Sequence, residues 1–175
     1  DWAADLIDRK SVSCVVCRIG KHMIRSSVGG QTFQALSSGE AEFCAGTRGG
    51  SIGLGIASLG RDFGDELMIE LWTDSSAAKG IASRIGLGKI RHLDTALLWL
   101  QNYVEKGRIK MKKEKGTENV ADLGTKDLDE TTMLKCLAQC GIFRENGRHP
   151  LALKAALGKE DTGVVYQLRR VTTVV

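Results

Sequence analysis

A short apolar run that ends at an aspartate and leads directly into an alanine-rich segment constrains the fold of this 175-residue chain most strongly. Residues 66–73 have the composition of a buried β-strand, and Ser75 and Ser76 then open a segment typical of a helix. Asp74 therefore stands at the carboxyl end of a predicted central strand, where open α/β sheets hold their sites. Taken alone, Asp74 is more readily explained as a cap of the next helix.

The rest of the chain alternates between strand and helix patterns. Strands are predicted where β-branched residues cluster or apolar and basic residues alternate, at 12–19, 22–27, 33–36 and 108–113. Gly29 and Gly30 are expected to end the second of these strands. Helices are predicted from capping signals and helical spacing at 41–59, 76 onward, 92–104, 119–126 and 131–139. The pattern predicts one α/β layered domain with a mixed sheet.

The first predicted helix has a strong start and a weak interior. Ser37 and Glu40 have the spacing of a capping box, with Ser38 as an alternative N-cap. Five glycines follow within the next segment, and each costs about 1 kcal/mol relative to alanine inside a helix. We therefore expect this helix to be weak or broken unless tertiary packing stabilises it.

Composition narrows the functional classes. The chain is 42% hydrophobic and 26% charged, as expected of a soluble globular protein, and its net charge of +4 permits a nucleic-acid partner without requiring one. No apolar run is long enough to span a bilayer, and the first residues do not form a signal peptide. The five cysteines favour reduced, buried thiols over disulfides or a zinc site, and hence a cytosolic or nuclear protein. Because the chain begins at Asp1 without a methionine, we expect it to be a fragment or a processed piece.

Carboxylates from separate parts of the chain are the best candidates for chemistry. They are Asp1, Glu40 or Glu42 on the first predicted helix, Asp74, and Asp122 on a late helix. Carboxylates brought together repel one another unless a cation neutralises them, and hard oxygen ligands favour Mg²⁺ or Mn²⁺. Two such ions, about 3.5–4 Å apart, can activate a water and stabilise the leaving oxygen of a phosphodiester.

The acidic residues lie in short sequence blocks: DWAAD and DRKS at the start, then ALSSGEAEF at 35–43, TDSSAA at 73–78, IRHLD at 90–94 and ENVADLGTK at 118–126. In content and in order, these blocks, which cover residues 1 to about 128, resemble the ribonuclease H domain of copia-type retrotransposon polyproteins. The residues after 128 are set apart as a C-terminal extension of unknown role.

The resemblance implies a mixed five-stranded sheet flanked by helices and cleavage of the RNA strand of an RNA–DNA hybrid with two divalent ions. It assigns the metal-binding, catalytic carboxylates to Glu42, Asp74 and Asp122, and leaves Glu40 as a capping residue. The family motif contains two aspartates at its start, and this chain begins at the second. The first carboxylate is therefore either Asp1 or a residue upstream of it.

The chain also departs from the family pattern. Two lysines suited to phosphate contacts are replaced in the segment 25–31, and the loop before Asp122 has no histidine. Arg108, Lys110 and Lys112 alternate along the last predicted strand, where they could contact a phosphate backbone or simply form a solvated face. A hybrid would be recognised by its shape and 2′-hydroxyls, with little sequence preference.

Three functions are compatible with these residues. The first is an active ribonuclease H beside a reverse transcriptase domain of the same polyprotein, in a cytoplasmic virus-like particle or the nucleus and not in a membrane or secreted. The second is a decayed domain that folds, and binds nucleic acid or serves a structural role without cutting. The third is a related integrase- or resolvase-like nuclease, which the position of a glutamate on the first helix disfavours.

Overall fold

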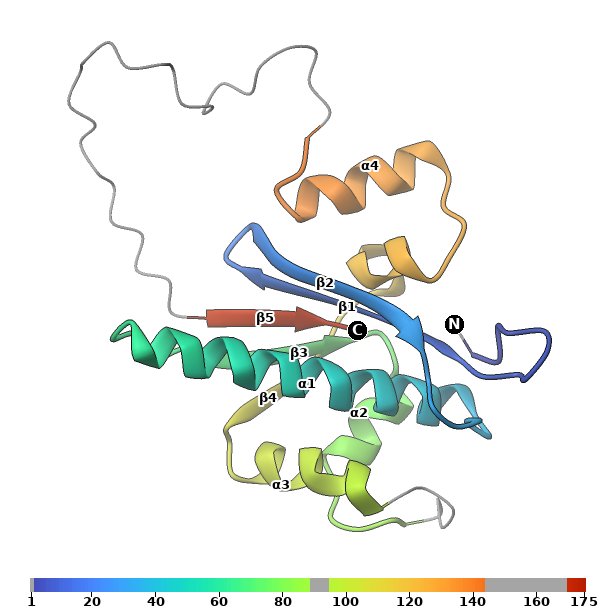
Figure 1. Ribbon diagram of the computed structural model, residues 1–175, viewed down its shortest axis with the longest axis horizontal. Coiled ribbons are helices and arrows are strands. Elements are labelled where there is room, and N and C mark those ends of the chain that lie inside the picture. The colour runs from blue at the N-terminus through green and yellow to red at the C-terminus, as the bar shows by residue number, and fades with distance from the viewer. Residues whose placement is uncertain (1, 89–94, 144–169) are drawn as a thin grey trace.

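Five strands form one mixed, open sheet in the order β2-β1-β5-β3-β4 (Figure 1). The computed structural model describes residues 2–88, 95–143 and 170–175. The strands are β1 (Val12–Ile19), β2 (His22–Gly30), β3 (Met68–Thr73), β4 (Ile109–Lys113) and β5 (Arg170–Val174). β1 is antiparallel to both β2 and β5, whereas β3 is parallel to both β5 and β4. The predicted α/β class, with a five-stranded mixed sheet flanked by helices, is confirmed.

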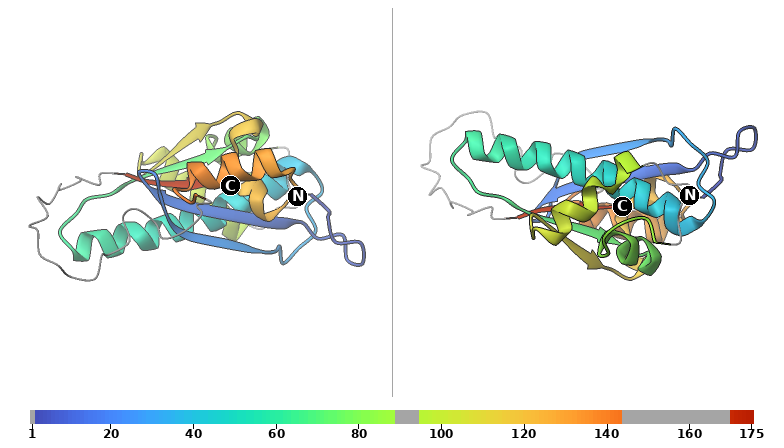
Figure 2. Two further views of the ribbon diagram at one scale, coloured as in Figure 1. Left: turned by 90° about the horizontal axis from the view of Figure 1, so that it is seen from above. Right: turned by 90° about the horizontal axis from the view of Figure 1, so that it is seen from below.

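Helices cover both faces of the sheet. The α-helices are α1 (Ser38–Asp62), α2 (Ser76–Ala82), α3 (Trp99–Glu105) and α4 (Glu130–Gln139), and the 3₁₀ turns are η1 (Thr95–Leu98), η2 (Gly116–Glu118) and η3 (Val120–Gly124). In Figures 1 and 2, α1, α2 and α3 lie on one face, while η3 and α4 lie on the other. Each face has its own core: Phe43 and Leu100 pack on the first, and Val120 and Cys136 on the second.

The fifth strand does not come from the predicted place. Residues 33–36 form no strand, and β5 comes instead from residues 170–174, which the sequence set apart as an extension. β5 pairs with β1 on one side and with β3 on the other, so it lies in the middle of the sheet. A domain that ended near residue 128 would lack this central strand.

Helix α1 is continuous over 25 residues, which the sequence allowed only if tertiary packing stabilised it. Gly49 and Gly53 face the sheet: a β-carbon on Gly49 would lie 3.1 Å from Leu71 Cδ1, and one on Gly53 would lie 3.1 Å from Ile69 Cγ2. The missing side chains let the helix approach the strands closely. Tertiary packing therefore offsets the low helix propensity of glycine.

Two other local predictions were inaccurate. β2 does not break before Gly29 and Gly30 but includes both as its last residues, which pair with β1. Within residues 119–126, where a helix was predicted, the chain forms only the short 3₁₀ turn η3, Val120–Gly124. The hairpin of β1 and β2, the strand before Asp74 and the helix over 131–139 lie where they were predicted, within two or three residues at each end.

Candidate active site

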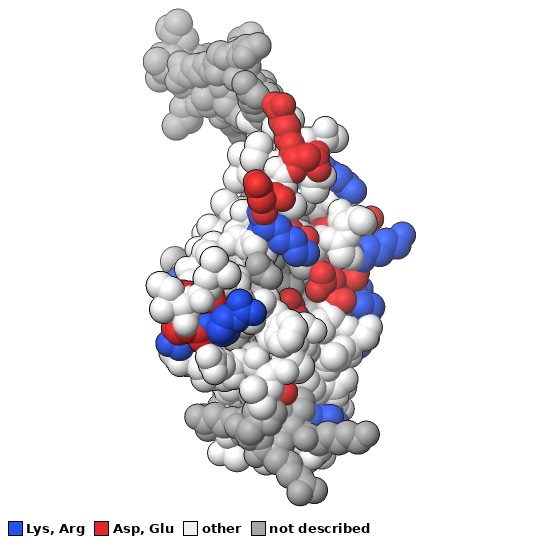
Figure 3. All heavy atoms as spheres, turned by 90° about the vertical axis from the view of Figure 1, so that its right-hand side faces the viewer, with Lys and Arg blue, Asp and Glu red and all other residues white. Residues whose placement is uncertain are grey.

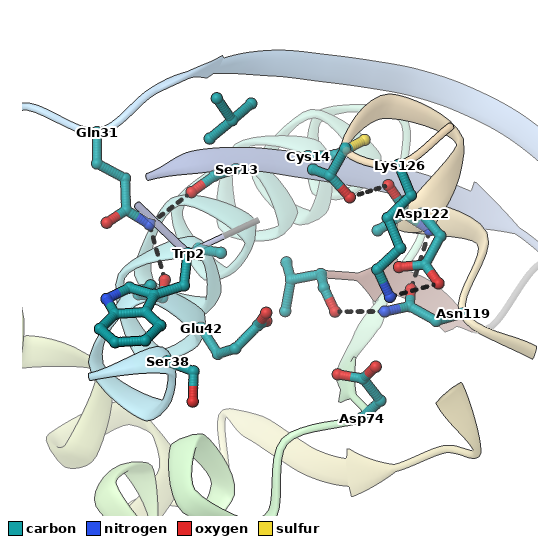
Figure 4. A pocket seen from close by; sticks show the side chains of 16 residues that line it. Trp2, Ser13, Cys14, Gln31, Ser38, Glu42, Asp74, Asn119, Asp122 and Lys126 are labelled. Carbon is teal, nitrogen blue, oxygen red and sulfur yellow. Dashed lines mark hydrogen bonds and ion pairs between the residues drawn. The ribbon is translucent and has the colours of Figure 1, made fainter. Parts of the chain in front are cut away.

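A pocket of about 240 Å³ opens at the carboxyl ends of the parallel strands β3 and β5. Three carboxylates from three different elements line it: Glu42 from α1, Asp74 from the end of β3 and Asp122 from η3 (Figure 4). All three are partly buried. Glu42 and Asp74 are 32 positions apart in the sequence, and Asp74 and Asp122 are 48 positions apart, yet the fold brings all three to one pocket.

Capping interactions at the start of α1 position Glu42. The Ser37 side chain caps the helix by accepting a hydrogen bond from the Glu40 N–H at 3.3 Å. The buried Glu40 carboxylate in turn accepts the Leu36 N–H at 2.9 Å. Glu40 therefore acts in the cap, as predicted, and Glu42 is the glutamate that reaches the pocket.

Asp74 lies where β3 ends and α2 has not yet begun. The N-cap of α2 is Ser75, whose hydroxyl accepts the Ala78 N–H at 3.1 Å. Asp74 is therefore not the cap, and its side chain points into the pocket (Figure 4). Its backbone carbonyl accepts a hydrogen bond from Lys113 Nζ at 2.6 Å, which ties the end of β3 to β4.

The turn η3 presents Asp122. Asn119 caps this turn by accepting the Ala121 N–H at 2.9 Å, and its Nδ2 donates to the carbonyl of Val175 at 3.4 Å. Asn119 thereby fastens η3 to the end of β5. The Asp122 carboxylate forms an ion pair with Lys126, with 3.0 Å between Oδ2 and Nζ.

The carboxylates influence one another. Burial and then the charge of Asp74 raise the pKa of Glu42, Asp122 raises it further, and Lys126 opposes the shift. The pKa of Lys126 is also raised, first by its hydrogen bond to Asp122 and then by the negative charges of Asp74 and Glu42. The pocket is therefore a region of negative potential that favours a cation.

The donor set fits Mg²⁺ or Mn²⁺, since every candidate ligand is a carboxylate oxygen. In the ranges that the structure describes, however, no three His, Cys, Asp or Glu side chains are gathered closely enough to form a finished metal site. In Figure 4 the Asp122 carboxylate lies beside the Lys126 ammonium, whereas Glu42 and Asp74 point into the open pocket. The five cysteines are all free and buried, and within the described residues they are not grouped into a zinc site either.

The predicted basic residues lie along an edge of the sheet. Arg108, Lys110 and Lys112 are exposed on or beside β4, which is an edge strand. Lys112 pairs with Trp72, two residues before Asp74, but none of the three basic side chains lines the pocket itself. Figure 3 looks at the end of the molecule where the pocket opens, and acidic and basic side chains are interspersed there without a continuous basic surface.

Two predicted features lie outside the described residues: Asp1, the candidate first carboxylate, and the IRHLD block at 90–94. Trp2, the neighbour of Asp1, lines the pocket and donates its indole N–H to the Ala35 carbonyl at 2.9 Å. The start of the described chain is therefore held beside the pocket.

Sequence reasoning assigned no role to Lys126 or Glu114. Lys126 lines the pocket, and its spacing of four residues from Asp122 was the available signal for an ion pair. Glu114 follows β4, and burial raises its pKa to about 7. Its Oε1 is buried without a hydrogen-bond partner in the described part of the protein, and no sequence pattern indicated this burial.

Comparison with protein families, with curated proteins and with solved structures finds no match to this chain. The likeness to the ribonuclease H domain therefore rests on its sequence motifs. Among the helices within 2–88, 95–143 and 170–175, none is long and apolar enough to cross a bilayer.

Proposed function

We propose that this chain is a metal-dependent endonuclease of the ribonuclease H type, which hydrolyses the RNA strand of RNA–DNA hybrids. One observation carries the proposal: Glu42, Asp74 and Asp122 reach a single pocket at the carboxyl ends of parallel strands. Such strand ends are where open α/β sheets place their sites. These three residues are also the ones that the resemblance to the ribonuclease H domain selects.

Glu42, Asp74 and Asp122 would hold the divalent ions, together with Asp1 or a residue upstream of it. Bound Mg²⁺ or Mn²⁺ would activate a water molecule and neutralise the charge that develops on the leaving oxygen of the phosphodiester. Burial and the charge of Asp74 raise the pKa of Glu42, so a neighbouring cation would stabilise the charged form of this side chain.

An RNA–DNA hybrid and the acidic pocket are both negatively charged, so positively charged side chains are needed to bind the hybrid near the pocket. Exposed Arg108, Lys110 and Lys112 lie along β4, and Lys112 is level with Trp72 near the pocket. Ammonium and guanidinium groups in such a row suit the regular spacing of phosphates. Shape and 2′-hydroxyls would then distinguish a hybrid from other duplexes, with little sequence preference.

In its biological setting, the domain would act beside the reverse transcriptase of the same polyprotein. Its task would be to remove genomic RNA after synthesis of the first DNA strand. A virus-like particle in the cytoplasm, or the nucleus, would be its place of action. This setting rests on the family resemblance alone.

A second candidate is a relic domain that binds nucleic acid without cutting it. The arrangement of Asp122 favours this candidate, because its carboxylate pairs with Lys126 and is not gathered with Glu42 and Asp74 into a metal site.

A cleavage assay distinguishes the active nuclease from the relic domain. Strand-labelled RNA–DNA hybrid, double-stranded RNA and double-stranded DNA are incubated with the folded protein in Mg²⁺ and in Mn²⁺. The enzyme cuts only the RNA strand of the hybrid, whereas the relic binds hybrid in a gel-shift assay and leaves both strands intact.

A further inference from the structure

The ammonium group of Lys126 is a cation that the chain itself supplies to the acidic pocket. Lys126 lines the pocket, and its Nζ lies 3.0 Å from Asp122 Oδ2. Glu42 and Asp74 line the same pocket, and in Figure 4 the Lys126 ammonium lies beside the Asp122 carboxylate while the other two carboxylates stand apart from it.

The backbone holds this cation in place. Lys126 donates its N–H to the Asp122 carbonyl at 3.0 Å, immediately after the turn η3. The two side chains are thereby fixed in an i, i+4 relationship. The Asp122 side chain is only 14% exposed, whereas that of Lys126 is 52% exposed, so the lysine rather than the aspartate is free to move.

We propose that Lys126 is a tethered counter-ion that competes with a divalent metal ion for Asp122. This inference rests on the proposed function, in which Asp122 is a metal ligand. An oxygen that accepts a hydrogen bond from an ammonium group has one lone pair fewer for a metal, and the positive charge repels a divalent ion nearby. For a divalent ion to bind Asp122 Oδ2, Lys126 would have to leave that oxygen.

The displaced ammonium would stay within reach of the pocket, because the hydrogen bond from the Lys126 N–H to the Asp122 carbonyl holds its backbone there. Its exposed side chain then has no carboxylate partner, and a phosphate group of the substrate is a suitable new one. Lys126 would in this way lower the metal affinity of the free protein and favour metal binding in the presence of the substrate. It acts on the metal through Asp122 and is a positioning residue.

Binding of Mn²⁺ to the full chain tests the inference without any substrate. Free Mn²⁺ is measured by electron paramagnetic resonance during titration of the wild type, Lys126→Gln and Lys126→Arg. Lys135→Gln is the matched control, because Lys135 is an exposed lysine on α4 outside the pocket. We expect Lys126→Gln to bind Mn²⁺ about tenfold more tightly, as removal of one nearby positive charge in a solvated site predicts. Lys126→Arg and Lys135→Gln should bind as the wild type does.

Two outcomes overturn the inference: unchanged or weaker binding by Lys126→Gln, and no saturable Mn²⁺ binding by either the wild type or Lys126→Gln. The first leaves the nuclease proposal standing if hybrid is still cut. If Lys126→Gln binds Mn²⁺ more tightly but the protein does not cut hybrid, the inference about Lys126 stands and the proposed nuclease function fails.

Discussion

Gly49 of α1 lies against Val175 at the end of β5, so closely that a β-carbon on Gly49 would stand 2.7 Å from Val175 Cγ1. The same carbon would lie 3.0 Å from Thr173 Cγ2. This contact sets the distance between the helix that carries Glu42 and the strand whose end lines the pocket. The glycines that weaken α1 as an isolated helix are thus a condition for assembling the site.

Gly49→Ala should lower the free energy of unfolding by about 1–3 kcal/mol, because the added methyl group overpacks the contact between α1 and β5. Gly55→Ala is the matched control: Gly55 lies in the same helix, and a β-carbon there meets nothing within 4 Å. The control should gain up to about 1 kcal/mol from helix propensity. Urea denaturation followed by circular dichroism measures both, and equal stability of the two variants would refute the close packing.

Loss of the Glu114 proton should make the protein less stable as the pH rises from about 4.5 to about 7. Burial raises the pKa of Glu114 from 4.5 to about 7 in the folded chain, whereas the unfolded chain loses the proton near the ordinary value. Between these two values the folded state binds more protons, so the free energy of unfolding falls with rising pH and then levels off.

A glutamine at position 114 cannot ionise, so the free energy of unfolding of the Glu114→Gln variant should decline less between pH 4.5 and about 7 than that of the wild type. Urea denaturation at pH 5, 6, 7 and 8 in the presence of a chelator, read against wild type, measures the difference. Glu105→Gln serves as the control, because Glu105 is exposed at the end of α3 and does not contribute to the raised pKa of Glu114. A Glu114→Gln profile that runs parallel to that of the wild type would show that this carboxyl titrates normally.

The basic stripe on β4 should determine how strongly salt weakens binding of the hybrid. Removing one lysine that neutralises a phosphate reduces the slope of log affinity against log salt by about 1. Lys110→Gln and Lys112→Gln, alone and combined, should therefore reduce the slope stepwise, and Lys135→Gln on α4 should not. Fluorescence anisotropy with labelled hybrid at several salt concentrations is the measurement. A slope that does not change would mean that these lysines only form a solvated edge, as is common for edge strands.

Local signals in the sequence predicted much of the fold. The capping pair Ser37 and Glu40, the strand that ends at Asp74 and the hairpin formed by β1 and β2 all depend on neighbouring residues, and the structure contains each of them. Motifs also identified Glu42, Asp74 and Asp122, which the fold brings to one pocket.

Features that depend on distant residues could not be predicted. β5 pairs with β1, and Cys17 lies 156 positions from its partner Thr173, so no short pattern indicates the pairing. The continuity of α1 depends on strands that lie beneath its glycines. The i, i+4 pair of Asp122 and Lys126 is local, but the contribution of Lys126 to the site becomes visible only when Glu42 and Asp74 are in place.

The most direct test of the central claim is cleavage of RNA-labelled hybrid in Mn²⁺ by the wild type, Asp74→Asn and Asp65→Asn. Asp74 lines the pocket, whereas Asp65 is an exposed aspartate in the loop before β3. If Asp74 holds a catalytic metal ion, Asp74→Asn lowers the cleavage rate by at least about a hundredfold, and Asp65→Asn cuts as the wild type does. Cleavage by Asp74→Asn at the rate of the wild type, or no cleavage by any of the three folded proteins, would contradict the account.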